Sequence, residues 1–510
     1  EVKMPGEAGN YFRVGDNYYK FIEKPNQYKK IENVIASRAK TTLVDDHGKH
    51  FIKHVQKYED FCNVPDHDNF EQVIHGCFNV YSPLDHKPEE EQCTEEDCPN
   101  VINLIKHIWG GKTVNYKNKD TGIKHEYKSW ELGMDYMQLL YQQPAQKMPI
   151  LCPVSRENNT GKSTLGFFLR EMLGANVAIV GNQDIASDFN AHWSTKSVVV
   201  IDEAKIDKVT VVEKIKMLST ARKIFMNAKG RGQVELDCFI KFVLITNNEE
   251  NFITASEDDI RYWVIKVPVL TNENPDMLAK LVDEIPAFLS LLNGRKLATE
   301  RMSRMWFHKD LLQTDALKKV IEYSAPVIVK DMRTKLKELF LITGDEEIFM
   351  TPSIIIKELI TKKQTEETYV IKVLKEHMKA QPYHVWVVEG KEVEYKDEET
   401  AVAVAEALFS NFKGPMIYSK ISRKYKSTRF KYPTPIEVFK DGIKETSWGF
   451  AAANGRPYVF KRKNYVTTDE ENENELGPEA KLLALKGGQN IMASDELIVQ
   501  PTGTIEELPF

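Results

Sequence analysis

The chain has 510 residues, which is too long for one ordinary hydrophobic core and predicts two to four domains. Hydrophobic residues make up 42% of it and charged residues 28%, which excludes a largely disordered protein. The formal net charge of −6 excludes a global basic field, so local patches would have to bind any nucleic acid.

The first part of the chain has a mixed pattern. The stretch "YFRVGDNYYKFI" predicts a short hairpin that turns at Gly15. Residues 101–109 and 130–147 have apolar residues at helical spacing. We therefore expect an α+β N-terminal region over residues 1–105 and a helical collar over residues 106–147.

From about residue 148 the pattern changes to alternating strands and helices. "MPILCPV" is a continuous apolar strand, and a polar loop and a helix follow it. The apolar strands "VAIV" and "SVVVID" come next, with a helix between them. Strands that are apolar throughout and alternate with helices favour a buried parallel sheet. The sequence therefore predicts an α/β domain over residues 148–305.

The pattern changes again after about residue 310. Two short helices, "TPSIIIKELI" and "TYVIKVLKEHM", precede apparent strands such as "HVWVV" and "GRPYVFKRKNYV". This order is typical of a helix-turn-helix with wings, and equally of an ordinary α+β packing domain. We expect a winged-helix-like α+β domain over residues 306–466. Residues 467–510 carry ten acidic residues and two lysines, which predicts a flexible acidic tail.

The loop "SRENNTGKST", residues 155–164, joins the first apolar strand to its helix. Its end matches the phosphate-binding motif G-x-x-x-x-G-K-[ST], although Arg156 stands where the motif begins with glycine. Backbone N–H groups at the helix start would point at phosphate oxygens. Lys162 would reach the β- and γ-phosphates, and the Ser163 hydroxyl would bind Mg²⁺. The predicted nucleotide-binding residues are Asn158, Asn159, Thr160, Gly161, Lys162, Ser163 and Thr164. The alternative is a surface turn that contains these residues by chance.

Polar residues also follow the later apolar strands. An ATPase needs one carboxylate to hold hydrated Mg²⁺ and another to orient the attacking water, and Asp202 and Glu203 fit these two roles. Asn247, at the end of "KFVLITNN", would bind the water or the γ-phosphate, or would simply cap a turn. Arg261 precedes another strand and would stabilise phosphoryl charge across a subunit boundary, or form a surface salt bridge with nearby acids.

In this order, these stretches resemble the superfamily 3 helicases of the AAA+ class, and most closely the phage and plasmid primase–helicases related to the poxvirus primase–helicase. The matching segments include "TGKST", "FNAHWSTKSVVVIDE", "KFVLITNNEENF" and "IRYWVIKVP". The resemblance implies an AAA+ P-loop ATPase that forms a ring, a homo-hexamer, with ATP between subunits and single-stranded DNA in the channel. It also implies family roles, namely Walker A for Lys162 and Ser163, Walker B for Asp202 and Glu203, sensor 1 for Asn247 and the arginine finger for Arg261.

The segment "KIFMNAKGRGQVELD" predicts a strand, a turn and a strand, with Lys229 and Arg231 at the tip. In the family, a hairpin here lines the pore, and contacts from Lys and Arg to DNA phosphates suit a motor that moves along any sequence. A plain surface hairpin is the alternative. Secondary candidates for DNA binding are Lys214, Lys216 and Lys223, and thirteen basic residues between 413 and 463 form a further basic stretch with interleaved aromatic residues.

We therefore expect an ATP-dependent DNA helicase or translocase of a phage or mobile-element replication system, with ATP and Mg²⁺ as cofactors. Its partners would be single-stranded DNA and a primase or polymerase of the same replicon. The alternatives are a ring ATPase that binds DNA without unwinding it, as an initiator, loader or packaging protein, and a non-enzymatic DNA-binding scaffold. Lys162, Asp202, Glu203 and Arg261 argue against the scaffold.

The number of cysteines and the length of the apolar runs indicate in which cellular compartment we expect the protein. Six cysteines are sparse for a disulfide scaffold, which predicts a reducing cytoplasm, that of the host cell if a phage encodes the protein. No run approaches the roughly 20 apolar residues of a membrane span, so we expect no membrane partner. Cys93 and Cys98 are candidates for a zinc site, but they lack the spacing of a standard one, so zinc there is the less favoured alternative.

Overall fold

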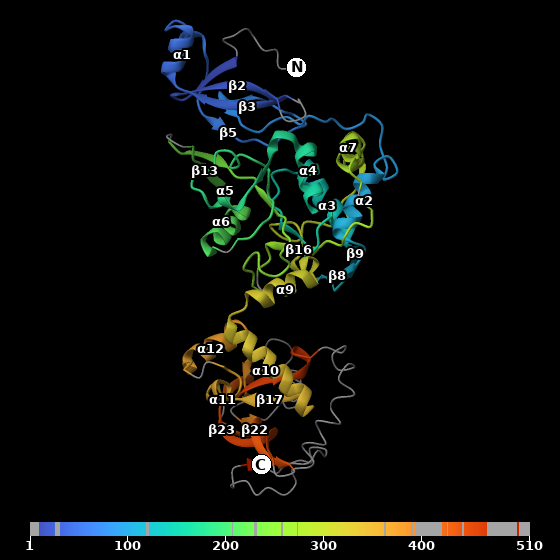
Figure 1. Ribbon diagram of the computed structural model, residues 1–510, viewed down its shortest axis with the longest axis vertical. Helices are drawn as coiled ribbons and strands as arrows, with labels where there is room; N and C mark the ends of the chain where they lie inside the picture. The colour runs from blue at the N-terminus through green and yellow to red at the C-terminus, as the bar shows by residue number, and fades with distance from the viewer. Residues whose placement is uncertain are drawn as a thin grey trace. The chain divides into compact units, whose positions relative to one another are not determined.

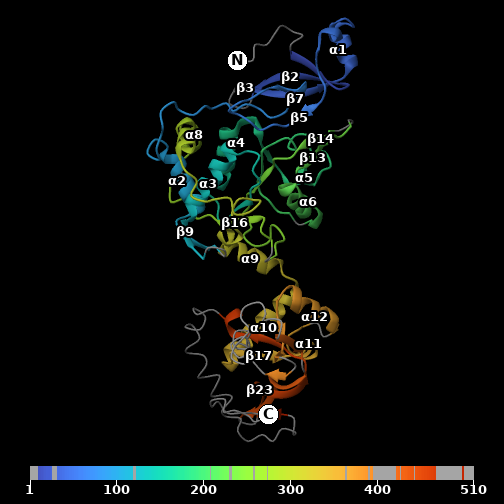
Figure 2. The same ribbon diagram turned by 180° about the vertical axis from the view of Figure 1, so that it is seen from behind.

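The chain divides into two compact units, Glu1–Ser324 and Ala325–Phe510, and Figure 1 and Figure 2 label many of their helices and strands. The computed structural model describes residues 10–25, 31–118, 122–206, 208–228, 232–256, 259–272, 274–361, 364–388, 391–393, 421–425, 427–440, 443–466 and 497–498. No helix in these ranges is long and apolar enough to cross a membrane.

Among the described residues of the first unit, the central sheet has five parallel strands in the order β11-β12-β15-β10-β16. The strands β10, β12 and β15 are buried along their whole length, as strands of a parallel sheet covered on both faces should be. The predicted buried parallel sheet is therefore confirmed. The strand bounds are β10 Ile150–Val154, β11 Val177–Val180, β12 Val198–Ile201, β15 Lys241–Leu244 and β16 Tyr262–Lys266.

The strand order places β10, the first of these strands in the chain, between β15 and β16. From β10 the chain enters helix α4 (Lys162–Leu173), crosses to the edge strand β11 and returns through β12 and β15. Because the strands are parallel, the carboxyl ends of β10, β12 and β15 lie at one edge of the sheet. In open α/β sheets, ligands bind outside these ends where the direction of winding reverses.

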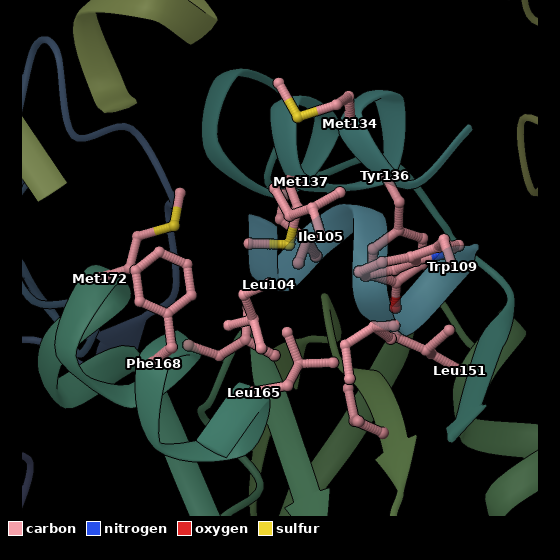
Figure 3. Packing of buried hydrophobic residues seen from close by; sticks show 14 of the residues in the cluster. Leu104, Ile105, Trp109, Met134, Tyr136, Met137, Leu151, Leu165, Phe168 and Met172 are labelled. Atoms are coloured by element: carbon pink, nitrogen blue, oxygen red, sulfur yellow. The ribbon is translucent and has the colours of Figure 1, made fainter. Parts of the chain in front are cut away.

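One face of the sheet is covered by helices. Some of them precede the sheet strands in the chain, and others lie between or after these strands. Alternate strand residues such as Leu151, Val200 and Val243 form one core with α4 and with α2, α3, α7 and α8. Figure 3 shows Leu151 and Leu165 beneath side chains of α2 and α3. The bounds are α2 Pro99–Trp109, α3 Ser129–Gln142, α7 Met277–Asp283, α8 Ile285–Gly294 and the 3₁₀ turns Gly174–Asn176 and Lys309–Leu312.

Helices α2 and α3 approach each other closely at Gly133. A Cβ atom at this position would lie 2.5 Å from the Trp109 ring, so only glycine fits. The Trp109 ring in turn lies 6.1 Å from that of Trp263 in β16. The region expected as a helical collar also contains a hairpin between these helices, formed by β8 (Thr113–Lys117) and β9 (Lys124–Lys128).

The opposite face of the sheet carries a second core. The intervening strand residues, among them Cys152, Val199 and Phe242, pack with α6, α9 and the β13–β14 pair. Phe12 and Phe78 from the N-terminal region join the same core, with stacked rings 4.6 Å apart. The bounds are α5 Asn182–Ala186, α6 Val209–Thr220, β13 Lys223–Met226, β14 Val234–Asp237 and α9 Asp315–Ser324.

The N-terminal region begins with the predicted hairpin, in which Val14 pairs with Asn17 and Gly15 has a φ of 53°. Its sheet has the order β3-β2-β1-β4, and a smaller sheet has the order β5-β7-β6. The bounds are β1 Tyr11–Val14, β2 Asn17–Pro25, β3 Ile31–Arg38, α1 Lys40–His47, the 3₁₀ turn Phe51–His54, β4 Gln56–Tyr58, β5 Phe61–Cys62, β6 Val73–Ile74 and β7 Cys77–Asn79.

The second unit has its own core, in which the helices α10, α11 and α12 pack with β17, β24 and strand β22. The two short helices predicted here are present as α11 and α12. The bounds are α10 Val327–Thr343, β17 Glu347–Met350, α11 Pro352–Glu358, α12 Glu367–Glu376, β18 Gln381–Pro382, β19 His384–Val388, β20 Lys391–Val393, β21 Ile421–Tyr425, β22 Thr428–Lys440, β23 Ile443–Gly455, β24 Tyr458–Lys461, a 3₁₀ turn Arg462–Asn464 and β25 Leu497–Ile498.

The boundary between the units lies between Ser324 and Ala325, whereas the sequence pattern placed a boundary between residues 305 and 306. The difference arises because α9 belongs to the first unit, where Leu317 and Val320 are buried in the second core of the sheet. Its amphipathic pattern alone does not say which core it covers. Apart from Leu497 and Ile498, the expected acidic tail lies outside the described residues.

Candidate nucleotide-binding site

The loop after β10 turns into α4 through a left-handed residue. Gly161 has a φ of 77° and directly precedes the first helical residue, Lys162. Asn159, two residues earlier, also has a positive φ of 53°. The N–H groups of the first turn of an α-helix have no partner within the helix, and here they lie at the carboxyl edge of the sheet. The predicted loop residues therefore form a turn whose backbone N–H groups suit an anion.

Lys162 is folded into this loop and is only 5% exposed. Its Nζ donates to Thr160 Oγ1 at 2.8 Å and to the carbonyl oxygen of Glu157 at 3.2 Å. Burial lowers the pKa of Lys162, while the carboxylates of Asp202 and Glu249 oppose that change. Phosphate oxygens in the loop would offer the ammonium stronger, charged acceptors than these neutral oxygens.

The two predicted magnesium ligands come together although 39 positions separate them. Ser163 Oγ lies 3.5 Å from Asp202 Oδ1, which is long for a hydrogen bond. Two neighbouring ligands of one Mg²⁺ ion, each about 2.1 Å from the metal, lie about 3 Å apart. One hydroxyl and one carboxylate match the way Mg²⁺ binds beside substrate phosphates, with water completing its shell. In the described parts of the chain, no group of three or more His, Cys, Asp or Glu side chains is placed to hold a metal.

Glu203 follows Asp202 with a φ of 55°, a left-handed conformation that costs a residue other than glycine about 1 kcal/mol or more. Asn182, at the start of α5 after the neighbouring strand β11, holds this backbone. Its Nδ2 donates to the Glu203 carbonyl at 3.0 Å, and its Oδ1 accepts from the Lys205 N–H at 3.2 Å. The Glu203 side chain is exposed at the same sheet edge. Sequence reasoning missed Asn182, although an amide two residues after an apolar strand was the signal.

Asn247 contacts the loop directly. Its Nδ2 donates to Asn158 Oδ1 at 3.2 Å, and the Ser155 N–H donates to the Thr246 carbonyl at 3.3 Å. The end of β15 and the start of the loop are therefore joined, as the parallel order of β10 and β15 requires.

Arg156, the residue in place of the motif's first glycine, is also bound from the segment after β15. Its N–H donates to Glu249 Oε1 at 3.0 Å, and its Nη2 donates to Glu250 Oε1 at 2.5 Å. Glu249 is 5% exposed and also pairs with Lys266 at 3.1 Å. The sequence reasoning missed both glutamates, because nothing local indicates that they meet Arg156.

Arg261 lies away from the loop of its own chain. It directly precedes β16, at the amino edge of the sheet, where its carbonyl accepts from the Ile150 N–H at 2.7 Å. Its guanidinium pairs with Asp259 at 3.2 Å. The loop lies at the opposite, carboxyl edge, so one chain does not bring Arg261 to it. A role across a subunit boundary stays a prediction.

The predicted DNA-binding residues Lys229 and Arg231 lie outside the described residues. The strands on either side of them, β13 and β14, are antiparallel, with Met226 opposite Val234, so the predicted pair of strands is present. The secondary candidates have partners within the chain, because Lys214 donates to the Ile185 carbonyl, Lys216 pairs with Asp259 and Lys223 pairs with Asp237. The basic stretch 413–463 is only partly described. All six cysteines, Cys93 and Cys98 among them, are free thiols.

A family model and several solved structures are similar to this chain. A family of unknown function, DUF5906, matches residues 154–261, from the end of β10 to the residue before β16. No curated protein matches the chain. An apo structure of the NrS-1 C-terminal region is similar at 14% identity and a TM-score of 0.47, covering 90% of this chain and 99% of that one. Two A-form apo structures of that region have 15% identity each, with TM-scores of 0.45 and 0.46, and cover 80% and 87% of this chain and 89% and 94% of theirs.

Proposed function

We propose that the protein is an ATP-dependent motor that moves along single-stranded DNA and unwinds duplex DNA during replication. One observation carries the proposal. The carboxyl edge of a parallel sheet gathers a loop with a left-handed Gly161, a buried Lys162 inside it, and the pair Ser163 and Asp202 beside it. These groups match the chemical needs of a nucleoside triphosphate with Mg²⁺.

Each residue has a distinct task in this proposal. The loop N–H groups and Lys162 bind the β- and γ-phosphates, and Ser163 and Asp202 hold Mg²⁺, which when bound neutralises phosphate charge. Glu203 orients the attacking water at the exposed edge of the sheet. Asn247 exchanges its present partner Asn158 for the water or the γ-phosphate.

The order of elements supports coupling to DNA. The β13–β14 pair lies in the chain between β12, which ends before Asp202, and β15, which ends before Asn247. The end of β13 nearest the turn is held against the segment after α5, because Asn190 Nδ2 donates to the Phe225 carbonyl at 2.8 Å and Asn190 Oδ1 accepts from the Asn227 N–H at 2.7 Å. In the proposed motor, displacements at the γ-phosphate move this hairpin, whose Lys229 and Arg231 bind the DNA backbone.

We further propose that the motor is a ring, a homo-hexamer, in which Arg261 reaches the ATP of the next subunit. Its position at the edge of the sheet opposite the loop agrees with a role outside its own site. In that arrangement, Arg261 exchanges Asp259 for the phosphoryl group of the neighbouring subunit's ATP.

The test is a hydrolysis and unwinding assay on the full chain. ATP hydrolysis should be stimulated by single-stranded DNA, and a forked duplex should be separated only when ATP is present. Lys162→Ala should lower hydrolysis about 100-fold or more, because it removes the charge that stabilises the reacting phosphates. Lys309→Ala, at an exposed lysine, is the matched control.

Full hydrolysis by the Lys162→Ala variant would show that the site is misplaced. Hydrolysis without stimulation by DNA and without unwinding would replace the helicase by a ring ATPase that binds DNA without separating its strands.

A further inference from the structure

The entrance of the phosphate loop is tied to the segment after β15 through a buried carboxylate. Glu249 accepts the Arg156 N–H at 3.0 Å and pairs with Lys266 Nζ at 3.1 Å. Glu249 follows β15, Arg156 follows β10, and Lys266 is the last residue of β16. Glu249 therefore connects the carboxyl ends of three adjacent strands at one point.

The charge of Glu249 is well supported despite its burial. An isolated buried carboxylate is costly, but here it has an ammonium partner and a backbone donor. Burial raises the pKa of Glu249, but the Arg156 N–H and Lys266 together bring it below its ordinary value. Glu249 is therefore ionised at neutral pH and accepts charge-assisted hydrogen bonds.

A second tie is made by the Arg156 side chain, whose Nη2 lies 2.5 Å from Glu250 Oε1. The Arg156 side chain is 66% exposed, so the ion pair contributes little by itself. The glycine usual at this position would keep the N–H that Glu249 accepts but could not reach Glu250. The two ties are thus separable by mutation. Here they are called the loop clasp, which comprises Arg156, Glu249 and Glu250.

The loop clasp also affects how Asn247 can change its hydrogen-bond partner. The bond from Asn247 to Asn158 must open if Asn247 is to reach a bound γ-phosphate. The bond from Glu249 to the Arg156 N–H holds the same segment against the loop and does not involve the Asn247 side chain. Asn247 can then change partner without its segment leaving the loop.

We propose that Glu249 is a positioning residue for nucleotide binding, which fixes the entrance of the phosphate loop and holds Asn247 beside it, and that Arg156 and Glu250 support it in a minor way. The inference rests on the proposed ATP site. It assigns a role to the residue that replaces the motif's glycine and to two glutamates outside the motif.

The experiment measures equilibrium binding of a fluorescent ATP analogue, together with KM and kcat for ATP hydrolysis, in the full chain. Glu249→Gln should weaken nucleotide binding and raise KM about 10-fold or more, because a buried charge-assisted hydrogen bond is lost. The value of kcat should fall less than KM rises. Glu250→Gln is the matched control, the same change one residue later, and it should alter binding by about 2-fold or less. Arg156→Gly should behave like Glu250→Gln.

A second readout separates positioning from mere stability. In a double-mutant cycle, Glu249→Gln and Asn247→Ala should be non-additive in nucleotide affinity, because Glu249 acts partly through Asn247. A double variant, Glu249→Gln with Lys266→Met, leaves no unpaired charge at this position. It can therefore replace the single variant if Glu249→Gln fails to fold. It should show the same raised KM.

The outcomes are distinguishable. Wild-type nucleotide affinity and KM in both Glu249 variants would overturn the inference while leaving the ATP site intact. Equal and negligible binding by the wild type and by Lys162→Ala would instead overturn the proposed function. Equal effects of Glu249→Gln and Glu250→Gln would also overturn the inference, because position-specific support by Glu249 would then be absent.

Discussion

At this site, a residue has the conformation and contacts that its neighbouring sequence predicts when its partner is also close in the sequence. Gly161 adopts the left-handed conformation that the end of a phosphate loop requires, and Lys162 folds back onto Thr160. Glu249 and Asn182 are different, because each gains its role from a partner on another strand. A residue type and its neighbours in sequence do not identify such roles.

A buried lysine, Lys241, should make the stability of the first unit depend on pH. It lies at the start of β15, is 1% exposed, and donates to the Pro144 carbonyl. Burial, aided by the charge of Lys147, lowers its pKa from 10.5 to about 7. Between pH 7 and about 10.5, the unfolded chain therefore binds more protons at this lysine than the folded chain does. In that window, Lys241 should make the unfolding free energy rise with pH by up to about 1.4 kcal/mol per unit, with no contribution to the slope well below pH 7.

Urea unfolding at several pH values between 7 and 10 checks this prediction. Lys241→Met should flatten the rise, and Lys309→Met, at an exposed lysine, should leave it in place. An unchanged slope in Lys241→Met would mean that Lys241 is protonated in the folded chain throughout this range.

At the scale of elements, the strands and helices around the site agree with the hydrophobic pattern. Strands β10, β12 and β15 are buried throughout, and apolar apart from Lys241, because both of their faces are covered by packed elements. Their carboxyl ends carry the loop, Asp202 and Asn247, which is how short polar motifs far apart in sequence reach one edge.

The residues between β13 and β14 should determine how strongly single-stranded DNA stimulates ATP hydrolysis. Lys229→Ala with Arg231→Ala should spare basal ATP hydrolysis and reduce its stimulation by single-stranded DNA, because two phosphate contacts per subunit are lost. The slope of log affinity against log salt should become shallower by roughly 1.4 for one subunit's contacts. Measurement of hydrolysis against DNA concentration at several salt concentrations checks it.

The matched control is Lys223→Ala in β13, since Lys223 already pairs with Asp237 at 3.0 Å. Equal loss of stimulation in the control, or none in the double variant, would count against a DNA-binding tip.

At the scale of the whole molecule, the division into two units follows from the cores. The hydrophobic clusters around the parallel sheet contain residues up to Ile321, and the cluster of the second unit begins at Ala325. None of these clusters shares a residue across the boundary. The described residues of each unit thus bury their own apolar surface, which is what independent folding requires.

We therefore predict that residues 1–324 fold without the rest of the chain and retain ATP binding. Calorimetry should show a cooperative transition with an unfolding enthalpy of roughly 230 kcal/mol, from about 0.7 kcal/mol per residue near 60 °C. A fragment that binds the fluorescent nucleotide as the full chain does is the positive result. A fragment that unfolds without a transition would mean that the first unit needs residues beyond Ser324.

The local structure follows from the sequence alone, namely the apolar strands, the loop with Gly161 and Lys162, and the short helices of the second unit. The sequence also predicted that Ser163 and Asp202 would meet, because the carboxyl ends of parallel strands share an edge. Other features follow from the packing of the whole domain, namely that β10 lies between β15 and β16, that Glu249 binds Arg156, and that Arg261 lies at the far edge. The physical reason is that periodicity and turn chemistry act over a few residues, whereas strand order and buried ion pairs depend on contacts between distant segments, which form only when the whole core packs.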